Sequence, residues 1–278
     1  MKTNREIYFN LFNENNLYLN DTVIKSVLCK VNSFKNFTEL AINFDNNCQN
    51  IDQVEKYVEK IRSGKPYQYV LNEAFFLGNS FFVDERVLIP RQETEQLLLE
   101  TMSKLDDLSL KSDIRVCDLC CGSGNIGITL KKRNPKLFVI CSDIDIKALE
   151  ITKINCDKHN VEILLCNGDL LEPIEKYKPI DVIICNPPYI EDIKDIDPQV
   201  LNYEPHSALI SIPGTSFYER IIRSYLPLMS DKWLLAFEIG TNQKDNLIKI
   251  INKYIPNTNF EFKIDIYGKE RFLFIWNS

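Results

Sequence analysis

The residues best suited to do chemistry in this sequence form a short stretch that follows an apolar run: Asn186, Pro187, Pro188 and Tyr189. The preceding residues 182–184 are Val-Ile-Ile, which is typical of a strand buried on both faces. Each proline removes a backbone donor, so the strand cannot continue past it. We therefore expect Asn186 at the carboxyl end of a strand, the edge at which open α/β sheets bind ligands.

This stretch could orient a planar nitrogen for methyl transfer. An amide nitrogen is a poor nucleophile because its lone pair is delocalised. The side-chain oxygen of Asn186 can accept one N–H of an NH₂ group, and the carbonyl of Pro187 can accept the other. Both bonds strengthen as the nitrogen becomes tetrahedral and positive, so they stabilise the transition state without a general base. Tyr189 can stack on the planar group and face the cationic centre.

A glycine-rich loop, "VCDLCCGSGNIG", is the second candidate site. Its glycines have the G-x-G-x-x-G spacing of dinucleotide-binding loops, but Asp118 stands just ahead of them and would repel a pyrophosphate. A carboxylate instead suits the ammonium and sulfonium of S-adenosylmethionine. We expect this cofactor to contact Asp118 and the loop residues Cys120, Cys121, Gly122, Ser123 and Gly124.

Two more acidic residues are expected at the same edge of the sheet. Asp143, in "CSDID", can accept both hydroxyls of a ribose, as it would for NAD. Asp169, in "CNGDLL" beside Leu170, can accept a hydrogen bond from the amine of an adenine. Either carboxylate alone could merely cap the following helix. Acidic residues at three successive strand ends favour a ligand site.

The elements that must position these residues are strands alternating with helices from residue 91 onward. This alternation predicts an α/β fold with a doubly wound, mostly parallel, seven-stranded sheet whose last two strands form an antiparallel pair at one edge. Strands are expected at 114–120, 138–144, 162–167, 181–186, 233–240, 260–267 and 271–276. Helices are expected at 125–133, 145–159, 215–229 and 241–254, and another opens at 93–99.

The chain before residue 91 has a different pattern. Residues 1–62 carry helix-like apolar spacing and predict a small helical domain. Over residues 1–75 nine Lys/Arg balance nine Asp/Glu, which favours a packing or partner-docking role over nucleic-acid binding. Residues 63–90 read as a connector with a hairpin around Gly78-Asn79 and a short strand ended by Pro90. Residues 91–278 form the main domain.

Composition excludes several classes of protein. The 278 residues contain no apolar run long enough to span a bilayer and no secretion signal, so we expect a cytoplasmic protein without a membrane anchor. A net charge of −6 argues against nucleic-acid binding. Nine cysteines fit reduced thiols, and with one C-x-x-C and two histidines we expect no metal site. Four cysteines are expected in the core: Cys117, Cys141, Cys166 and Cys185.

The motifs resemble a known family. "NPPYI", "DLCCGSGNIGI" and "SDIDIKAL" are similar to class I S-adenosylmethionine methyltransferases that modify planar nitrogens, a class that includes DNA adenine enzymes. Over residues 63–275, stretches such as "VLIPRQETEQLL", "EPHSALIS", "LAFEIGTNQ" and "DIYGKERFLF" resemble the peptide chain release factor glutamine N5-methyltransferases. This chain departs from that family at Cys120-Cys121, where Gly-Thr is usual, and at Gln92, where a proline is usual.

The resemblance implies methylation of the glutamine in a Gly-Gly-Gln motif of bacterial-type release factors, by a monomer whose residues 1–62 dock the substrate protein. It implies that Gly122, Gly124, Asp143, Leu170 beside Asp169, and Asn186 line the cofactor, while residues 186–189 hold the glutamine. Three alternatives remain open. One is a DNA or RNA base N-methyltransferase, the second is a cofactor-binding module that transfers nothing, and the third is a dehydrogenase.

Overall fold

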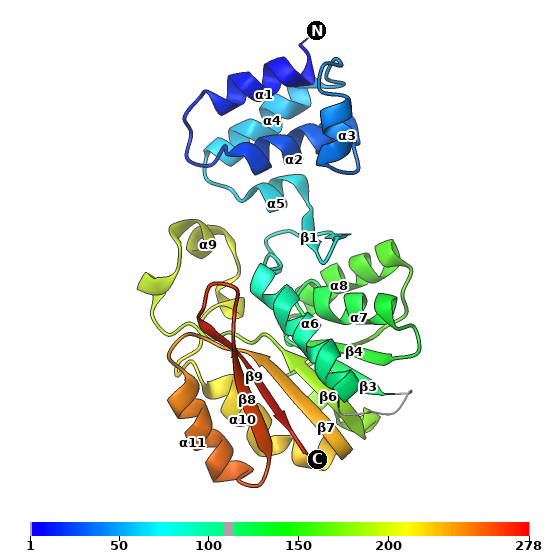
Figure 1. Cartoon of the computed structure of the whole chain (residues 1–278), viewed down its shortest axis with the longest axis vertical. Helices are drawn as coiled ribbons and strands as arrows, with labels where there is room; N and C mark the ends of the chain where they lie inside the picture. The colour runs from blue at the N-terminus through cyan, green and yellow to red at the C-terminus, as the bar shows by residue number, and fades with distance from the viewer. Residues whose placement is uncertain (1, 108–113, 278) are drawn as a thin grey trace. The chain divides into compact units, whose positions relative to one another are not determined.

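The computed structural model describes residues 2–107 and 114–277. The chain divides into two compact units, Met1–Glu73 and Ala74–Ser278 (Figure 1). The expected connector, residues 63–90, is shared between them, because helix α5 (Tyr67–Leu71) lies in the first unit and a hairpin lies in the second. Among the described residues, no helix has both the length and the apolar character needed to cross a membrane.

The first unit is helical. Besides α5 it contains α1 (Asn4–Phe12), α2 (Asp21–Asn32), α3 (Phe37–Ile42) and α4 (Ile51–Arg62). Apolar side chains at helical spacing bury one face of each longer helix, so that Leu11, Leu28 and Val58 share one core. Helices α1 to α4 begin where side-chain oxygens accept backbone N–H groups, as Asn20 does from Val23, whereas α5 follows Pro66.

The second unit is built on a seven-stranded sheet in the order β5-β4-β3-β6-β7-β9-β8. Its strands are β3 (Arg115–Leu119), β4 (Phe138–Asp143), β5 (Leu164–Asn167), β6 (Ile180–Cys185), β7 (Met229–Glu238), β8 (Asn259–Ile264) and β9 (Glu270–Trp276). Neighbours from β5 to β7 run parallel, and β9 pairs antiparallel with both β7 and β8. The predicted doubly wound sheet with an antiparallel edge pair is confirmed.

Alternate residues of the strands face two separate cores. Val116, Val182 and Leu234 pack in one, and Cys117, Ile183 and Leu235 pack in the other. The first core lies under α6 (Gln92–Asp107), α7 (Asn125–Arg133) and α8 (Ile146–His159), and the second lies under α10 (Ser216–Ser224) and α11 (Lys244–Tyr254) (Figure 1). The expected core cysteines are all buried in these clusters.

The chain order creates a switch point between β3 and β6. From β3 the sheet grows outward through β4 and β5, and the chain then returns to place β6 on the other side of β3. Leu119 and Cys185, the last residues of these two strands, are register partners. Ligands of open α/β sheets bind where strand order reverses, so the segments after β3 and β6 meet at the expected place.

Several local predictions were wrong. The helix expected at 215–229 ends at Ser224, because Pro227 cannot continue it, and a 3₁₀ turn η4 (Leu226–Leu228) follows. The hairpin β1 (Ala74–Phe76) and β2 (Asn79–Phe81) turns at Leu77-Gly78, not Gly78-Asn79, since both turn residues have positive φ. No strand precedes Pro90 in the described residues 82–90.

The remaining elements are η1 (Glu172–Tyr177), η2 (Ile193–Asp195), α9 (Pro198–Tyr203) and η3 (His206–Ala208).

Candidate active site

The loop between β3 and α7 turns sharply through left-handed residues. Cys120, Gly122 and Gly124 have φ values of 55°, 53° and 75°. A Cβ at Gly124 would lie 2.6 Å from Cγ2 of Thr152, so this glycine lets α7 approach α8. At Gly122 a Cβ would meet no atom within 4 Å. The backbone of Gly122 is therefore open to a ligand.

Asp118 is a buried carboxylate with an unused oxygen. It is 1% exposed, and its Oδ2 accepts a hydrogen bond from the backbone N–H of Gly127 at 2.9 Å. Its Oδ1 is buried and has no hydrogen-bond partner. Burial raises the pKa of Asp118 to about 7. A carboxylate of this kind is suited to pair with a ligand cation.

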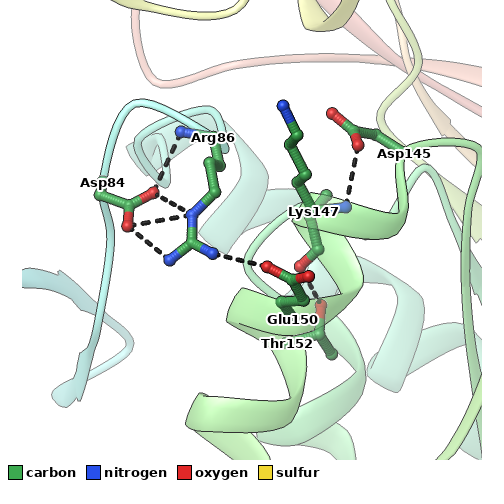
Figure 2. Close-up of polar contacts among 7 residues, drawn as sticks. Asp84, Arg86, Asp145, Lys147, Glu150 and Thr152 are labelled. Atoms are coloured by element: carbon green, nitrogen blue, oxygen red, sulfur yellow. Dashed lines mark hydrogen bonds and ion pairs between the residues drawn. The ribbon is translucent and has the colours of Figure 1, made fainter.

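Asp143 holds the loop in place from the end of β4. Its Oδ2 accepts the N–H of Gly122 at 2.9 Å, and its Oδ1 accepts the N–H of Asp145 at 3.0 Å. Burial raises the pKa of Asp143. The cap of α8 is Asp145, whose side chain accepts the N–H of Lys147 at 2.9 Å (Figure 2). Asp143 is thus free of the capping role, and its remaining lone pairs can accept hydroxyl groups.

These groups line a cavity with an empty volume of about 840 Å³, open solvent included. At its rim the Arg86 guanidinium forms a two-point pair with Asp84 and donates to Oε2 of Glu150 at 2.8 Å (Figure 2). The expected site residues that line this first cavity are Asp118, Cys120, Cys121, Gly122, Ser123, Asp143, Asn186 and Pro188.

Other expected residues lie elsewhere. Asp169 forms an ion pair with Arg220 and is not among the residues that line the first cavity. Leu170 is buried beside it with a φ of 47° and does not line the cavity either. Gly124 allows the turn of the loop but does not line the cavity. Pro187 is buried and does not line it either.

Asn186 lies at the junction of the first cavity with a second one. It lines both, and the second cavity has an empty volume of about 600 Å³ and includes Arg91, Tyr189 and Glu238 in its walls. Nδ2 of Asn186 donates to Oγ1 of Thr94 at 3.1 Å. The hydrogen bond described for the Asn186 side chain uses Nδ2 and not Oδ1. In the described structure Oδ1 can therefore accept a hydrogen bond from a ligand.

Tyr189 is held through both its ring and its hydroxyl. The hydroxyl donates to Oε1 of Glu238 at 3.2 Å, and the guanidinium of Arg271 lies 6.0 Å from the ring centroid. Burial and the neighbouring Glu238 raise the pKa of the Tyr189 hydroxyl. The ring therefore forms a fixed wall of the second cavity.

Several residues in these walls, or bonded to them as Glu204 is to Arg91, were missed by sequence reasoning. Thr94 and Glu238 bond to each other and connect Asn186 with Tyr189. Glu204, 4% exposed, accepts from the N–H of Ile89 at 3.0 Å and from Arg91 at 2.6 Å. All lie in stretches that carried the family resemblance. No spacing in the sequence pairs them, because Thr94 is 92 residues from Asn186 and 144 from Glu238.

Among the described residues, no group of three or more His, Cys, Asp or Glu side chains is arranged to hold a metal ion. All nine cysteines are free thiols.

Comparisons with known proteins agree with this architecture. The methyltransferase small domain family matches residues 92–202. The chain is 35% identical to the release factor glutamine methyltransferase of Bacillus cereus over 223 residues, which is 79% of each chain. It is 36% identical to the enzyme of the same name from Staphylococcus aureus, again over 79% of each. A methyltransferase structure from Pyrococcus furiosus shares the fold with a TM-score of 0.54 at 14% identity, over 73% of this chain and 90% of that one. The chain belongs to the release factor glutamine methyltransferase family.

Proposed function

We propose that this protein methylates the side-chain amide nitrogen of the glutamine in the Gly-Gly-Gln motif of peptide chain release factors, with S-adenosylmethionine as methyl donor. The relatives' names support the reaction. The observation that carries it is the position of Asn186 between two cavities, one walled by Asp118 and Asp143 and the other by Tyr189. Such a junction suits an amide that must meet a methyl donor.

The first cavity fits the cofactor. S-adenosylmethionine supplies, when bound, a methyl group activated by a sulfonium. The unpartnered Oδ1 of Asp118 is a suitable acceptor for a ligand ammonium, and the carboxylate of Asp143 is suited to ribose hydroxyls. The open backbone of Gly122 allows close approach. Asp169 has no part in this proposal because it is paired with Arg220 outside the lining.

The second cavity fits the glutamine side chain. Oδ1 of Asn186 accepts one N–H of the substrate amide. The expected acceptor for the other is the carbonyl of Pro187, which follows Asn186 in the chain but is not among the residues that line either cavity. As the nitrogen gains positive charge, these bonds strengthen and lower the barrier. The ring of Tyr189 forms the wall against which the planar amide packs.

The remaining features of the proposal concern partner and location. We expect a monomer that binds bacterial-type release factors through a surface to which the helices of residues 1–62 contribute. A cytoplasmic location fits nine free thiols. A nucleic-acid base with an exocyclic amine would present similar planar chemistry to Asn186, but the net charge of −6 disfavours a phosphate backbone.

The test is methylation of a purified release factor by the full chain with S-adenosylmethionine. Mass spectrometry should find a gain of one CH₂ on the Gly-Gly-Gln peptide and none when that glutamine is replaced by alanine. DNA and RNA oligonucleotides serve as the competing substrates. Methylation of an oligonucleotide but not of the release factor would overturn the proposal. A rise in melting temperature with NAD, and none with S-adenosylmethionine, would point to the dehydrogenase alternative.

A further inference from the structure

Four side chains from distant parts of the second unit form one hydrogen-bonded chain. Asn186 donates to Thr94 at 3.1 Å, and Thr94 donates to Oε2 of Glu238 at 2.6 Å. Tyr189 donates to Oε1 of the same carboxylate at 3.2 Å. Thr94 and Glu238 are 3% and 2% exposed, so water does not compete for these bonds.

Glu238 lies between Thr94 and Tyr189 in this chain, and its backbone is held as well. The Tyr218 hydroxyl donates to the backbone carbonyl of Glu238 at 2.8 Å, which fixes the strand end. Burial raises the pKa of Glu238 and the Glu93 charge adds to this, while the Thr94 bond, the Arg271 charge and the Tyr189 bond lower it. The Arg271 charge and the two hydroxyl bonds favour the ionised form, in which the carboxylate has acceptors only and both hydroxyls point their protons at it.

The direction of every bond in the chain follows from that carboxylate. A threonine hydroxyl has one proton, and Thr94 gives it to Glu238. Only lone pairs of Thr94 then face Asn186, so Asn186 must present its NH₂ group to Thr94. Its Oδ1 is consequently turned to the other side of the amide.

We propose that Thr94 and Glu238 are positioning residues that fix the orientation of the Asn186 amide, so that Asn186 presents an acceptor and not a donor to the substrate amide. The inference rests on the proposed function, because an N–H of the substrate is what this acceptor would bind. If Asn186 were reversed, its NH₂ would face the substrate NH₂, and two donors cannot bond.

Breaking the chain at Thr94 tests the inference. Thr94→Val keeps the shape of the side chain and removes the hydroxyl, whereas Thr94→Ser keeps the hydroxyl and is the matched control. With saturating S-adenosylmethionine and release factor, we expect the single-turnover rate of Thr94→Val to fall about tenfold. Thr94→Ser should stay within about twofold of wild type. Thr94 also lines the first cavity, so the dissociation constant for S-adenosylmethionine is measured for both variants, and it should change less than the rate does.

Glu238→Gln tests whether the Glu238 carboxylate sets the direction of the hydrogen bonds in this chain. The glutamine offers one acceptor and one donor in place of two acceptors, so the hydroxyl of Thr94 or of Tyr189 must reverse. We expect a rate loss on the order of tenfold. Since Glu238 is proposed to act through Thr94, Glu238→Gln added to Thr94→Val should lower the rate by less than about twofold further.

The outcomes separate this inference from the proposed function. Asn186→Ala, measured in parallel, reports the direct contact. If Asn186→Ala is slow while folded Thr94→Val and Glu238→Gln both react at wild-type rate, the positioning role is wrong and the proposed function stands. Fully multiplicative losses in the double variant would also overturn it, because Glu238 would then act independently of Thr94. A wild-type protein that does not methylate the release factor would overturn both. If Thr94→Val does not fold, the nearly isosteric Glu238→Gln decides.

Discussion

The two cavities that meet at Asn186 are built in different ways. The first contains one continuous stretch, the loop after β3 with the open backbone of Gly122, and carboxylates placed by adjacent strand ends. The second depends on side chains from segments far apart in sequence, joined by buried hydrogen bonds. Part of the first cavity is therefore encoded by one continuous stretch of sequence, whereas the groups that orient the reacting amide are joined only by tertiary contacts.

The largest effect is expected from Asn186→Ala, at the junction of the two cavities. The substrate amide loses an acceptor whose hydrogen bond strengthens in the transition state, so kcat should fall on the order of 10²–10³. Cofactor affinity should fall far less. Single-turnover methylation of a release factor, with cofactor titration and thermal melts on the same preparation, measures both.

This variant also tests whether Asn186 is only a turn residue. In that case its loss would lower the melting temperature and leave the rate of the folded protein unchanged. A folded, cofactor-saturated Asn186→Ala protein that methylates at near wild-type rate would remove Asn186 from the mechanism.

Asp143→Ala should damage the first cavity alone. It removes two acceptors for ribose hydroxyls and also releases the N–H of Gly122, so the dissociation constant for S-adenosylmethionine should rise about 10²-fold. Calorimetry measures the change. Asp169→Ala is the matched control, because Asp169 pairs with Arg220 outside the lining and its loss should leave affinity unchanged. Equal losses in the two variants would contradict this assignment of the cavity.

Asp118→Asn should weaken cofactor binding roughly tenfold near neutral pH, since it removes the charge but keeps the acceptor for Gly127. The effect is smaller than for Asp143 because the pKa of Asp118 is about 7. Near neutral pH the free energy needed to ionise Asp118 offsets part of the free energy gained from pairing with the cation.

The pH dependence of binding sharpens this prediction. A bound cation favours the ionised carboxylate and lowers the pKa of Asp118, so binding releases a proton. Wild-type affinity should therefore increase as pH rises to about 7 and then level off. Calorimetry at several pH values should show a weaker dependence for Asp118→Asn, with the residual slope due to Asp143, whose pKa is also raised. Identical slopes in the two proteins would exclude Asp118 from contact with the cation.

The smallest effect is expected from Tyr189→Phe. The ring still forms the wall of the second cavity, and Glu238 keeps the Thr94 hydroxyl as a donor, so kcat should fall roughly two- to fivefold. Tyr189→Ala, which removes the wall, should lose much more. If Phe and Ala variants are equally impaired in steady-state methylation, the hydroxyl and not the ring is the important group.

Local sequence patterns were enough to predict the sheet and the loop site. A short continuous apolar run is a local pattern, and β3 and β6 are buried strands as predicted, with Asp118 and Asn186 near their ends. The loop residues that line the first cavity are adjacent in the chain, so the motif alone places them together. Local signals misplaced the end of α10 because the helical pattern continues past the point where Pro227 stops it.

Which distant side chains complete the site depends on how the strands and helices pack together. The bonds from Thr94 to Asn186 and Glu238 exist because β6 and β7 are neighbours and α6 packs against β7, and no periodicity encodes that adjacency. The same holds for Asp169, which the motif suggested as a cofactor contact and which the fold pairs with Arg220. Residue type and local spacing fix what a side chain can bond, whereas the packing of the sheet and its helices fixes which partner is within reach.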